Sequence, residues 1–228
     1  VEEADLENQM DRLRLFAQSN LLRVAAADIT QRIPLMVVSD YLTEIAEVVV
    51  EEVLRVATVD LQRKHGRPLK GEGSRQGEAG FTVIAYGKLG GIELGYGSDL
   101  DLVFLHDSAG REQRTVGAKS VENAVFLTRL GQRIIHMLET FTAAGVLYEV
   151  DMRLRPSGSS GLLVSSLEAF ADYQHNEAWT WEHQALARAR VVAGSDGLAD
   201  RFARVREQVL ARERDAAELR DEVRTMRE

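Results

Sequence analysis

Two aspartates separated by one residue, Asp99 and Asp101, stand at the beginning of an apolar run, Leu-Val-Phe-Leu. Side chains alternate between the faces of a β-strand, so both carboxylates point to one side, with their Cα atoms about 6 to 7 Å apart. Mg²⁺ prefers carboxylate oxygens and keeps positions for water and substrate phosphates. An Asp-x-Asp pair by itself is common in solvated turns, but a pair that opens a buried strand predicts two divalent ions and phosphoryl transfer.

The pair follows a glycine-rich stretch that connects two apolar runs, from Gly87 to Gly97. Glycine permits a positive φ and close backbone approach, so successive N–H groups can point at a phosphate, and Lys88 adds a positive charge. We therefore expect this stretch to hold the phosphates of a nucleoside triphosphate. Its candidate binding residues are Gly87, Lys88, Gly90 and Gly91.

A third candidate carboxylate, Asp151, lies in a segment where apolar and ionic residues alternate, residues 148–155. This period of two predicts a half-buried strand with one ionic face. If that strand neighbours the first, Asp151 completes a group of three carboxylates. Glu149 on the same face is an alternative, and Asp151 could instead pair with Arg153 or Arg155. The guanidinium groups of these two arginines also suit phosphate oxygens.

The surrounding sequence predicts helices on both sides of this region. Apolar residues recur at the 3.6-residue period of an amphipathic helix, and short β-favouring runs lie between them. The predicted helices cover residues 6–30, 38–56, 120–144 with Gly145 as the cap, 178–190 and 202–226, and another runs through Tyr173 from a capping box of Ser165 and Glu168. The predicted strands cover residues 81–86, 100–106 and 148–154.

These elements divide the chain into four parts. We expect an N-terminal helical segment over residues 1–65, and over residues 66–79 a flexible connection, because this segment is rich in glycine. A core over residues 80–195 follows, and residues 196–228 begin a C-terminal helical region. The chain starts without a methionine and stops inside a predicted helix, so we expect it to be a piece of a longer protein.

Composition restricts the class of protein. The 228 residues are 45% hydrophobic and 28% charged, contain no cysteine, and offer neither a membrane span nor a leader peptide. We expect a soluble, cytoplasmic protein without a disulfide framework. The net charge of −8 disfavours bulk binding of nucleic acid. Trp179 and Trp181 are interpreted as packing residues rather than as surfaces for base stacking.

Several of these stretches together resemble a known family. Gly87-Lys88 with Ser98-Asp99-Leu100-Asp101, a following strand and a later isolated carboxylate resemble the DNA polymerase β-like nucleotidyltransferase superfamily. More narrowly, residues 86–107, 148–158 and 177–190 resemble bacterial glutamine synthetase adenylyltransferases. The resemblance implies an α+β fold: a small mixed β-sheet with helices, flanked by N-terminal and C-terminal helices.

The resemblance also implies an activity and the residues that perform it. That family is an internal duplication: one half attaches AMP from ATP to a tyrosine of glutamine synthetase, and the other half removes it by phosphorolysis. Asp99 and Asp101 would bind two Mg²⁺ ions, and Asp151 would bind the catalytic one. Ser98 would help to hold the leaving phosphates. Arg153 and Arg155 would stabilise the charge that develops during transfer.

The motifs resemble the C-terminal, adenylylating half more than the removing half. They are Glu-Leu-Gly-Tyr before Ser98, Leu-His-Asp after the strand, and Trp-Thr-Trp-Glu-His. The implied partners are glutamine synthetase as substrate and a PII-type signalling protein as regulator, with no nucleic acid and no membrane. Three alternatives stay open: the removing half, a nucleotidyltransferase with another acceptor, and a module that binds nucleotide without turnover.

Overall fold

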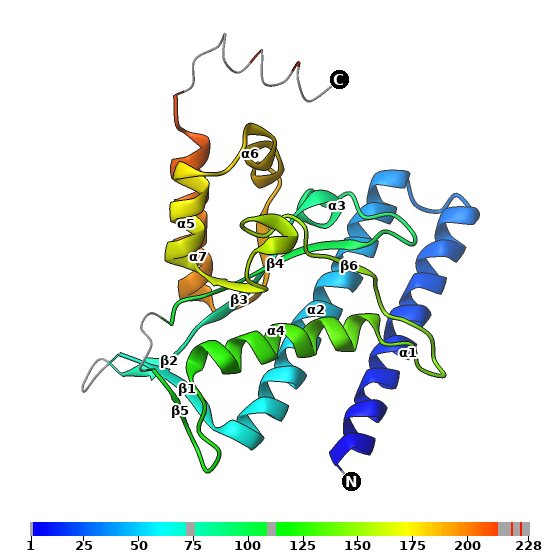
Figure 1. Cartoon of the computed structure of the whole chain (residues 1–228). Coiled ribbons are helices and arrows are strands. Elements are labelled where there is room, and N and C mark those ends of the chain that lie inside the picture. Colours follow the sequence, from blue (N-terminus) through cyan, green and yellow to red (C-terminus); the bar gives the residue numbers. More distant parts are fainter. Residues whose placement is uncertain (1, 72–75, 109–112, 214–219, 221–223, 225–228) are drawn as a thin grey trace.

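The computed structural model describes residues 2–71, 76–108 and 113–213, together with Arg220 and Arg224 (Figure 1). The elements in chain order are α1 (Glu2–Ile29), α2 (Leu35–His65), β1 (Arg67–Lys70), β2 (Gly77–Glu78), β3 (Phe81–Ala85), α3 (Gly87–Gly90), β4 (Leu100–His106), β5 (Thr115–Val116), α4 (Asn123–Glu139), β6 (Val150–Asp151), β7 (Val164–Ser166), α5 (Leu167–Asn176), α6 (Thr180–Leu186), β8 (Arg190–Gly194) and α7 (Asp196–Leu210).

The main sheet is mixed and has β4 near its centre. β4 runs antiparallel to β3, which runs antiparallel to β8. On its other side β4 pairs in parallel with β6 near its beginning and with β7 near its end. A separate small sheet has the strand order β2-β1-β5. The predicted α+β fold with a small mixed sheet is confirmed.

Two layers of helices cover the main sheet, and β4 contributes side chains to both. Leu102 and Phe104 belong to a hydrophobic cluster that also contains residues of α1, α2 and α4. Val103 and Leu105 belong to a second cluster, with residues of α5, α6 and α7. Figure 1 shows the two groups of helices on opposite sides of β3 and β4. Because both of its faces are covered, β4 reads as a continuous apolar run rather than as an alternating one.

The long helix α2 forms much of the first layer. Its valines and leucines recur at helical spacing, and Val49, Val50 and Val53 are completely buried. The helix ends at His65 and is capped by Gly66, which has a φ of 80° and donates its N–H to the carbonyl of Gln62. Residues of α2 and of the main sheet belong to the same hydrophobic cluster. The division of the chain into domains at residues 66–79 stays a prediction.

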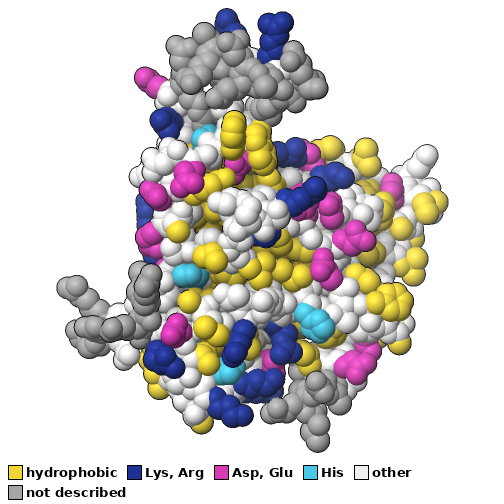
Figure 2. All heavy atoms as spheres, in the orientation of Figure 1, with side chains coloured by type: hydrophobic (Ala, Val, Ile, Leu, Met, Phe, Trp, Pro, Cys, Tyr) yellow, Lys and Arg dark blue, Asp and Glu magenta, His cyan; other side chains and the backbone are white. Residues whose placement is uncertain are grey.

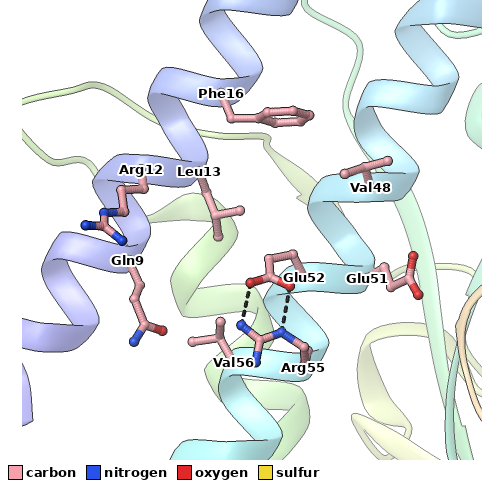
Figure 3. Close-up of a pocket in the computed structure, with 9 residues that line it drawn as sticks. All are labelled: Gln9, Arg12, Leu13, Phe16, Val48, Glu51, Glu52, Arg55 and Val56. Atoms are coloured by element: carbon pink, nitrogen blue, oxygen red, sulfur yellow. Dashed lines mark hydrogen bonds and ion pairs between the residues drawn. The ribbon is translucent and has the colours of Figure 1, made fainter.

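An open groove lies between α1 and α2 (Figure 3), with a volume of about 630 Å³. Phe16 of α1 points across it towards Val48 of α2, and both side chains are partly exposed, at 41% and 49%. An ion pair between Glu52 and Arg55 lies along the same side of α2. The groove therefore leaves these apolar side chains partly open to solvent between the two helices.

The structure differs from the predicted helix over residues 120–144. α4 ends at Glu139, and Gly145 lies in the loop that leads to β6. The physical reason is Arg14 of α1, whose completely buried guanidinium donates to the carbonyls of Met137 (3.4 Å), Thr140 and Gly145 (2.6 Å). These carbonyls have an arginine as donor instead of a further helical turn.

The structure also differs from other local predictions or covers them only in part. The segment predicted as a flexible connection carries the strands β1 and β2, and the predicted strand over residues 148–154 is ordered as a strand only in β6. The helix predicted over residues 178–190 ends at Leu186, and Arg190 begins β8. The cap of α5 is Ser166 rather than Ser165, with its side chain accepting from the N–H of Ala169. The predicted C-terminal helix is present as α7 to Leu210, and most of its remainder lies outside the described residues.

Charged side chains of both signs are interspersed over the face shown in Figure 2, with a small group of lysines and arginines in its lower part. Among the described helices, none combines the length and the apolar composition that crossing a membrane requires.

We expect Arg14→Met to lower the free energy of unfolding by about 2 to 4 kcal/mol, because the buried carbonyl of Met137 and the partly buried carbonyls of Thr140 and Gly145 lose a charged donor. Urea denaturation measures this loss. Arg12→Met is the matched control, since Arg12 is exposed on the same helix, and its effect should stay within about 0.5 kcal/mol. Equal losses in the two variants would contradict the role given to Arg14.

Candidate active site

The strands that carry Asp101 and Asp151 are direct neighbours. β4 and β6 run in parallel, with Leu100 opposite Val150 and Asp101 opposite Asp151. The N–H of Leu100 donates to the carbonyl of Glu149 at 2.9 Å and extends this pairing by one residue. The adjacency that the predicted site requires is therefore present.

Asp101 is the carboxylate most affected by this arrangement. Burial, followed by the negative charges of Asp99 and Asp151, raises the pKa of Asp101, while the charges of Arg153 and Lys88 lower it in part. Asp99 itself is exposed and comes just before β4. Three carboxylates and two cationic groups thus lie within electrostatic range of one another.

Asp151 is held by an arginine two residues further along the chain. One carboxylate oxygen accepts from the Nε and Nη2 of Arg153, at 2.7 and 2.5 Å, and the other accepts from its backbone N–H at 2.8 Å. These hydrogen bonds lower the pKa of Asp151 despite partial burial. Of the two candidates on this segment, Asp151 lies opposite Asp101, whereas Glu149 is exposed.

The glycine-rich stretch begins with the short helix α3, which packs directly on the acidic group. Gly87 has a φ of 52°, and a Cβ at this position would overlap the carboxylate of Asp101. The exposed Lys88 has its Nζ 3.5 Å from the Oγ of Ser98, which also accepts from the N–H of Gly95 at 3.2 Å. Gly87, Lys88 and Ser98 are thereby brought beside the aspartates.

Gly90 and Gly91 are closely packed in the turn, and their role in phosphate binding stays a prediction. Their N–H groups are used within the turn, donating to the carbonyls of Tyr86 (2.7 Å) and Gly87 (3.0 Å). A Cβ on Gly90 would overlap backbone atoms of Ala85 and Arg188, and one on Gly91 would overlap the Arg188 guanidinium. The absence of a side chain at these two positions permits close packing. Their backbone N–H groups are hydrogen-bonded within the turn.

Arg155, the last of the predicted site residues, has partners besides Asp151. Arg155 lowers the pKa of Asp151 electrostatically, and it also donates to the carbonyls of Met152 and Ser159, at 2.8 and 3.1 Å.

The interpretation of the tryptophans as packing residues was wrong for Trp179, which is 70% exposed, while Trp181 is 41% exposed. Hydrophobic side chains accordingly appear on the surface over α6 in Figure 2.

Sequence reasoning missed the arginines that support the glycine turn. It placed Arg188 and Arg190 in a helix, whereas they precede and begin β8 and lie against α3. The available signal was the run Val191-Val192-Ala193-Gly194, which favours a strand.

The donor chemistry of the site fits a divalent cation. Asp99, Asp101 and Asp151 offer the hard oxygen ligands that Mg²⁺ prefers, and burial together with the charges of Asp99 and Asp151 raises the pKa of Asp101. As the side chains stand, no three His, Cys, Asp or Glu residues in the described part of the chain form a group that could hold a metal ion. Both oxygens of Asp151 are engaged by Arg153, and this ion pair is the contact that a cation would have to replace.

The sequence of the chain is similar to those of known proteins. A sequence profile described as "Glutamate-ammonia ligase adenylyltransferase" matches residues 1–205. Proteins named bifunctional glutamine synthetase adenylyltransferase/adenylyl-removing enzyme are 60% identical over 228 residues in Thioalkalivibrio sulfidiphilus and 57% identical over 224 residues in Hahella chejuensis. The matches cover 100% and 98% of this chain, but only 24% and 23% of the lengths of the two relatives. The chain belongs to the glutamate-ammonia ligase adenylyltransferase family.

Proposed function

We propose that this chain carries the site that transfers AMP from ATP to a tyrosine hydroxyl of glutamine synthetase. The observation that carries the proposal is the parallel register of Asp101 with Asp151, beside a glycine turn that places Lys88 and Ser98 at the same end of the sheet. The names of the similar proteins supply the acceptor, since each includes glutamine synthetase adenylyltransferase.

The proposed reaction forms a bond between the tyrosine oxygen and the α-phosphorus and breaks the bond from that phosphorus to the β-phosphate oxygen, releasing pyrophosphate. Two Mg²⁺ ions held by Asp99, Asp101 and Asp151 would supply the positive charge that such a displacement needs. Asp151 or the metal itself would help to remove the tyrosine proton, and a cation at Asp151 would replace the hydrogen bonds from Arg153.

The basic and polar residues of the site bind and orient the nucleotide in this proposal. Lys88 and Ser98 hold the leaving phosphates, and Gly87 lets the backbone approach them. Arg153 and Arg155 stabilise the charge that develops during transfer. Gly90 and Gly91 contribute through the shape of the turn, because their N–H groups are already bonded.

A PII-type signalling protein as regulator, and the cytoplasm as the location of the reaction, are parts of the same proposal. Both depend on the resemblance to the family.

The adenylyl-removing reaction is the second candidate, because the names of the relatives include both activities and this chain covers about a quarter of each relative. Phosphorolysis would use the same carboxylates with AMP-tyrosine and phosphate as substrates. Release of ADP from adenylylated glutamine synthetase in the presence of phosphate distinguishes this reaction from transfer.

We expect Asp151→Asn to reduce AMP transfer at least about 100-fold, as loss of a group that stabilises the transition state does in other enzymes. The measurement is transfer of label from α-labelled ATP to purified glutamine synthetase in the presence of Mg²⁺. Glu149→Gln is the matched control, since it neutralises an exposed carboxylate two residues earlier and should leave transfer unchanged. The reverse result would identify Glu149 as the third carboxylate.

We expect Asp101→Asn to abolish transfer while leaving the thermal midpoint of unfolding without metal equal or higher at neutral pH. The pKa of Asp101 is raised in the folded chain, so ionisation of this carboxyl lowers stability as the pH rises through the interval between its ordinary and its raised pKa. Asparagine removes that charge. A clear fall in the midpoint would show that the Asp101 carboxylate stabilises the fold, contrary to the charge repulsion described above.

A further inference from the structure

Arg190, the first residue of β8, lies against the glycine turn but belongs to none of the groups proposed for the chemistry. It pairs with Ala85 at the end of β3, immediately before that turn. Its Nε donates to the carbonyl of Gly90 at 3.1 Å, and its Nη2 donates to the carbonyl of Leu89 at 2.9 Å. The Arg190 guanidinium thus adds donors to the carbonyls at the end of α3, of which that of Leu89 also accepts from the N–H of Ile92 at 3.3 Å.

The same guanidinium forms an ion pair with Glu47 of α2. The side chains of Arg190 and Glu47 are 28% and 32% exposed, so water screens this pair less than a pair on the open surface. The planar donors of arginine allow it to hold a carboxylate and two carbonyls at once, which lysine cannot do with the same geometry. Arg190 thereby connects the end of the glycine turn to the long helix that supports the sheet.

The position of α3 matters because its first residues touch the acidic group. The backbone of Gly87 lies against the carboxylate of Asp101 without room for a Cβ, and Lys88 extends towards Ser98. A displacement of α3 therefore changes the distance from Lys88 to the carboxylates. Misplacement of a binding group by about 1 Å is enough to weaken binding and catalysis considerably.

We propose that Arg190 is a positioning residue that fixes the nucleotide-binding turn, and that Glu47 holds Arg190 in place, so that helix α2 sets the affinity for the triphosphate. This inference rests on the proposed function, because it assigns the triphosphate to the turn. It adds two residues that touch neither the phosphates nor the reacting atoms.

The test compares Arg190→Lys and Glu47→Gln with the matched controls Arg133→Lys and Asp60→Asn. The control pair also joins a neighbouring element to α2, with an N–O distance of 3.2 Å and side chains that are 26% and 22% exposed, but it lies between α4 and α2. Two quantities are measured on each chain: the Kd for Mg-ATP by calorimetry, and hydrogen–deuterium exchange of the amides in residues 87–91.

We expect Arg190→Lys to weaken ATP binding about tenfold and to accelerate exchange at Gly90 and Gly91, because two hydrogen bonds that restrain the turn are lost. Glu47→Gln should have a smaller effect of the same kind, of about threefold, since the carbonyl contacts remain. Both control variants should leave the Kd and the exchange of the turn unchanged.

The inference is overturned if wild-type chain binds ATP while Arg190→Lys changes neither the Kd nor the exchange, or changes the exchange alone. Equal weakening in the control variants would also overturn it, because the effect would then reflect general destabilisation. A wild-type chain that binds no ATP would overturn the proposed function itself, and the exchange data would then show only whether Arg190 restrains the turn.

Discussion

The parallel pairing of β4 with β6 places two carboxylates of like charge opposite each other, and much of the structure serves to maintain that arrangement. Repulsion between like charges on neighbouring strands is substantial where water is partly excluded. The two carboxylates differ in their surroundings. Arg153 forms an ion pair with Asp151, while the pKa of Asp101 is raised. The two hydrophobic clusters cover both faces of β4, the strand that carries Asp101.

The parts of the fold that could be predicted from the sequence are those governed by local patterns. Residues 81–85 and 100–106 form strands because they belong to short apolar runs that end in turn residues, and α2 forms because its apolar residues have a period of 3.6. Polar contacts between distant segments were not visible in the same way. The end of α4 depends on Arg14, more than 120 residues away in the chain, and no local pattern indicates that contact.

In the candidate site, too, the residue types could be predicted from the sequence, whereas their contacts with distant segments could not. The types and spacing of Asp99, Asp101 and Asp151 were sufficient to expect a common site, and the register of β4 with β6 confirms that the strands of the last two are neighbours. The roles of these residues in catalysis stay predictions. Glycines were harder to interpret, because a sequence does not show whether the missing side chain makes room for a ligand or for another part of the protein. Gly90 and Gly91 are of the second kind.

The apolar character of β4 on both faces has a consequence for how the chain finds its native alignment. In a strand with one polar face, a slip of one residue would bury polar groups, and the hydrophobic pattern would reject it. Residues 102–105 are all apolar, so the hydrophobic pattern of the strand does not by itself reject the slipped alignment. The alignment is instead set by close packing and by polar side chains at the ends of the strand, such as Asp107, whose carboxylate accepts from the N–H of Gly80 at 2.7 Å. A misaligned chain would keep a hydrophobic core and lose its site, so compactness alone is a poor measure of whether this protein has folded correctly.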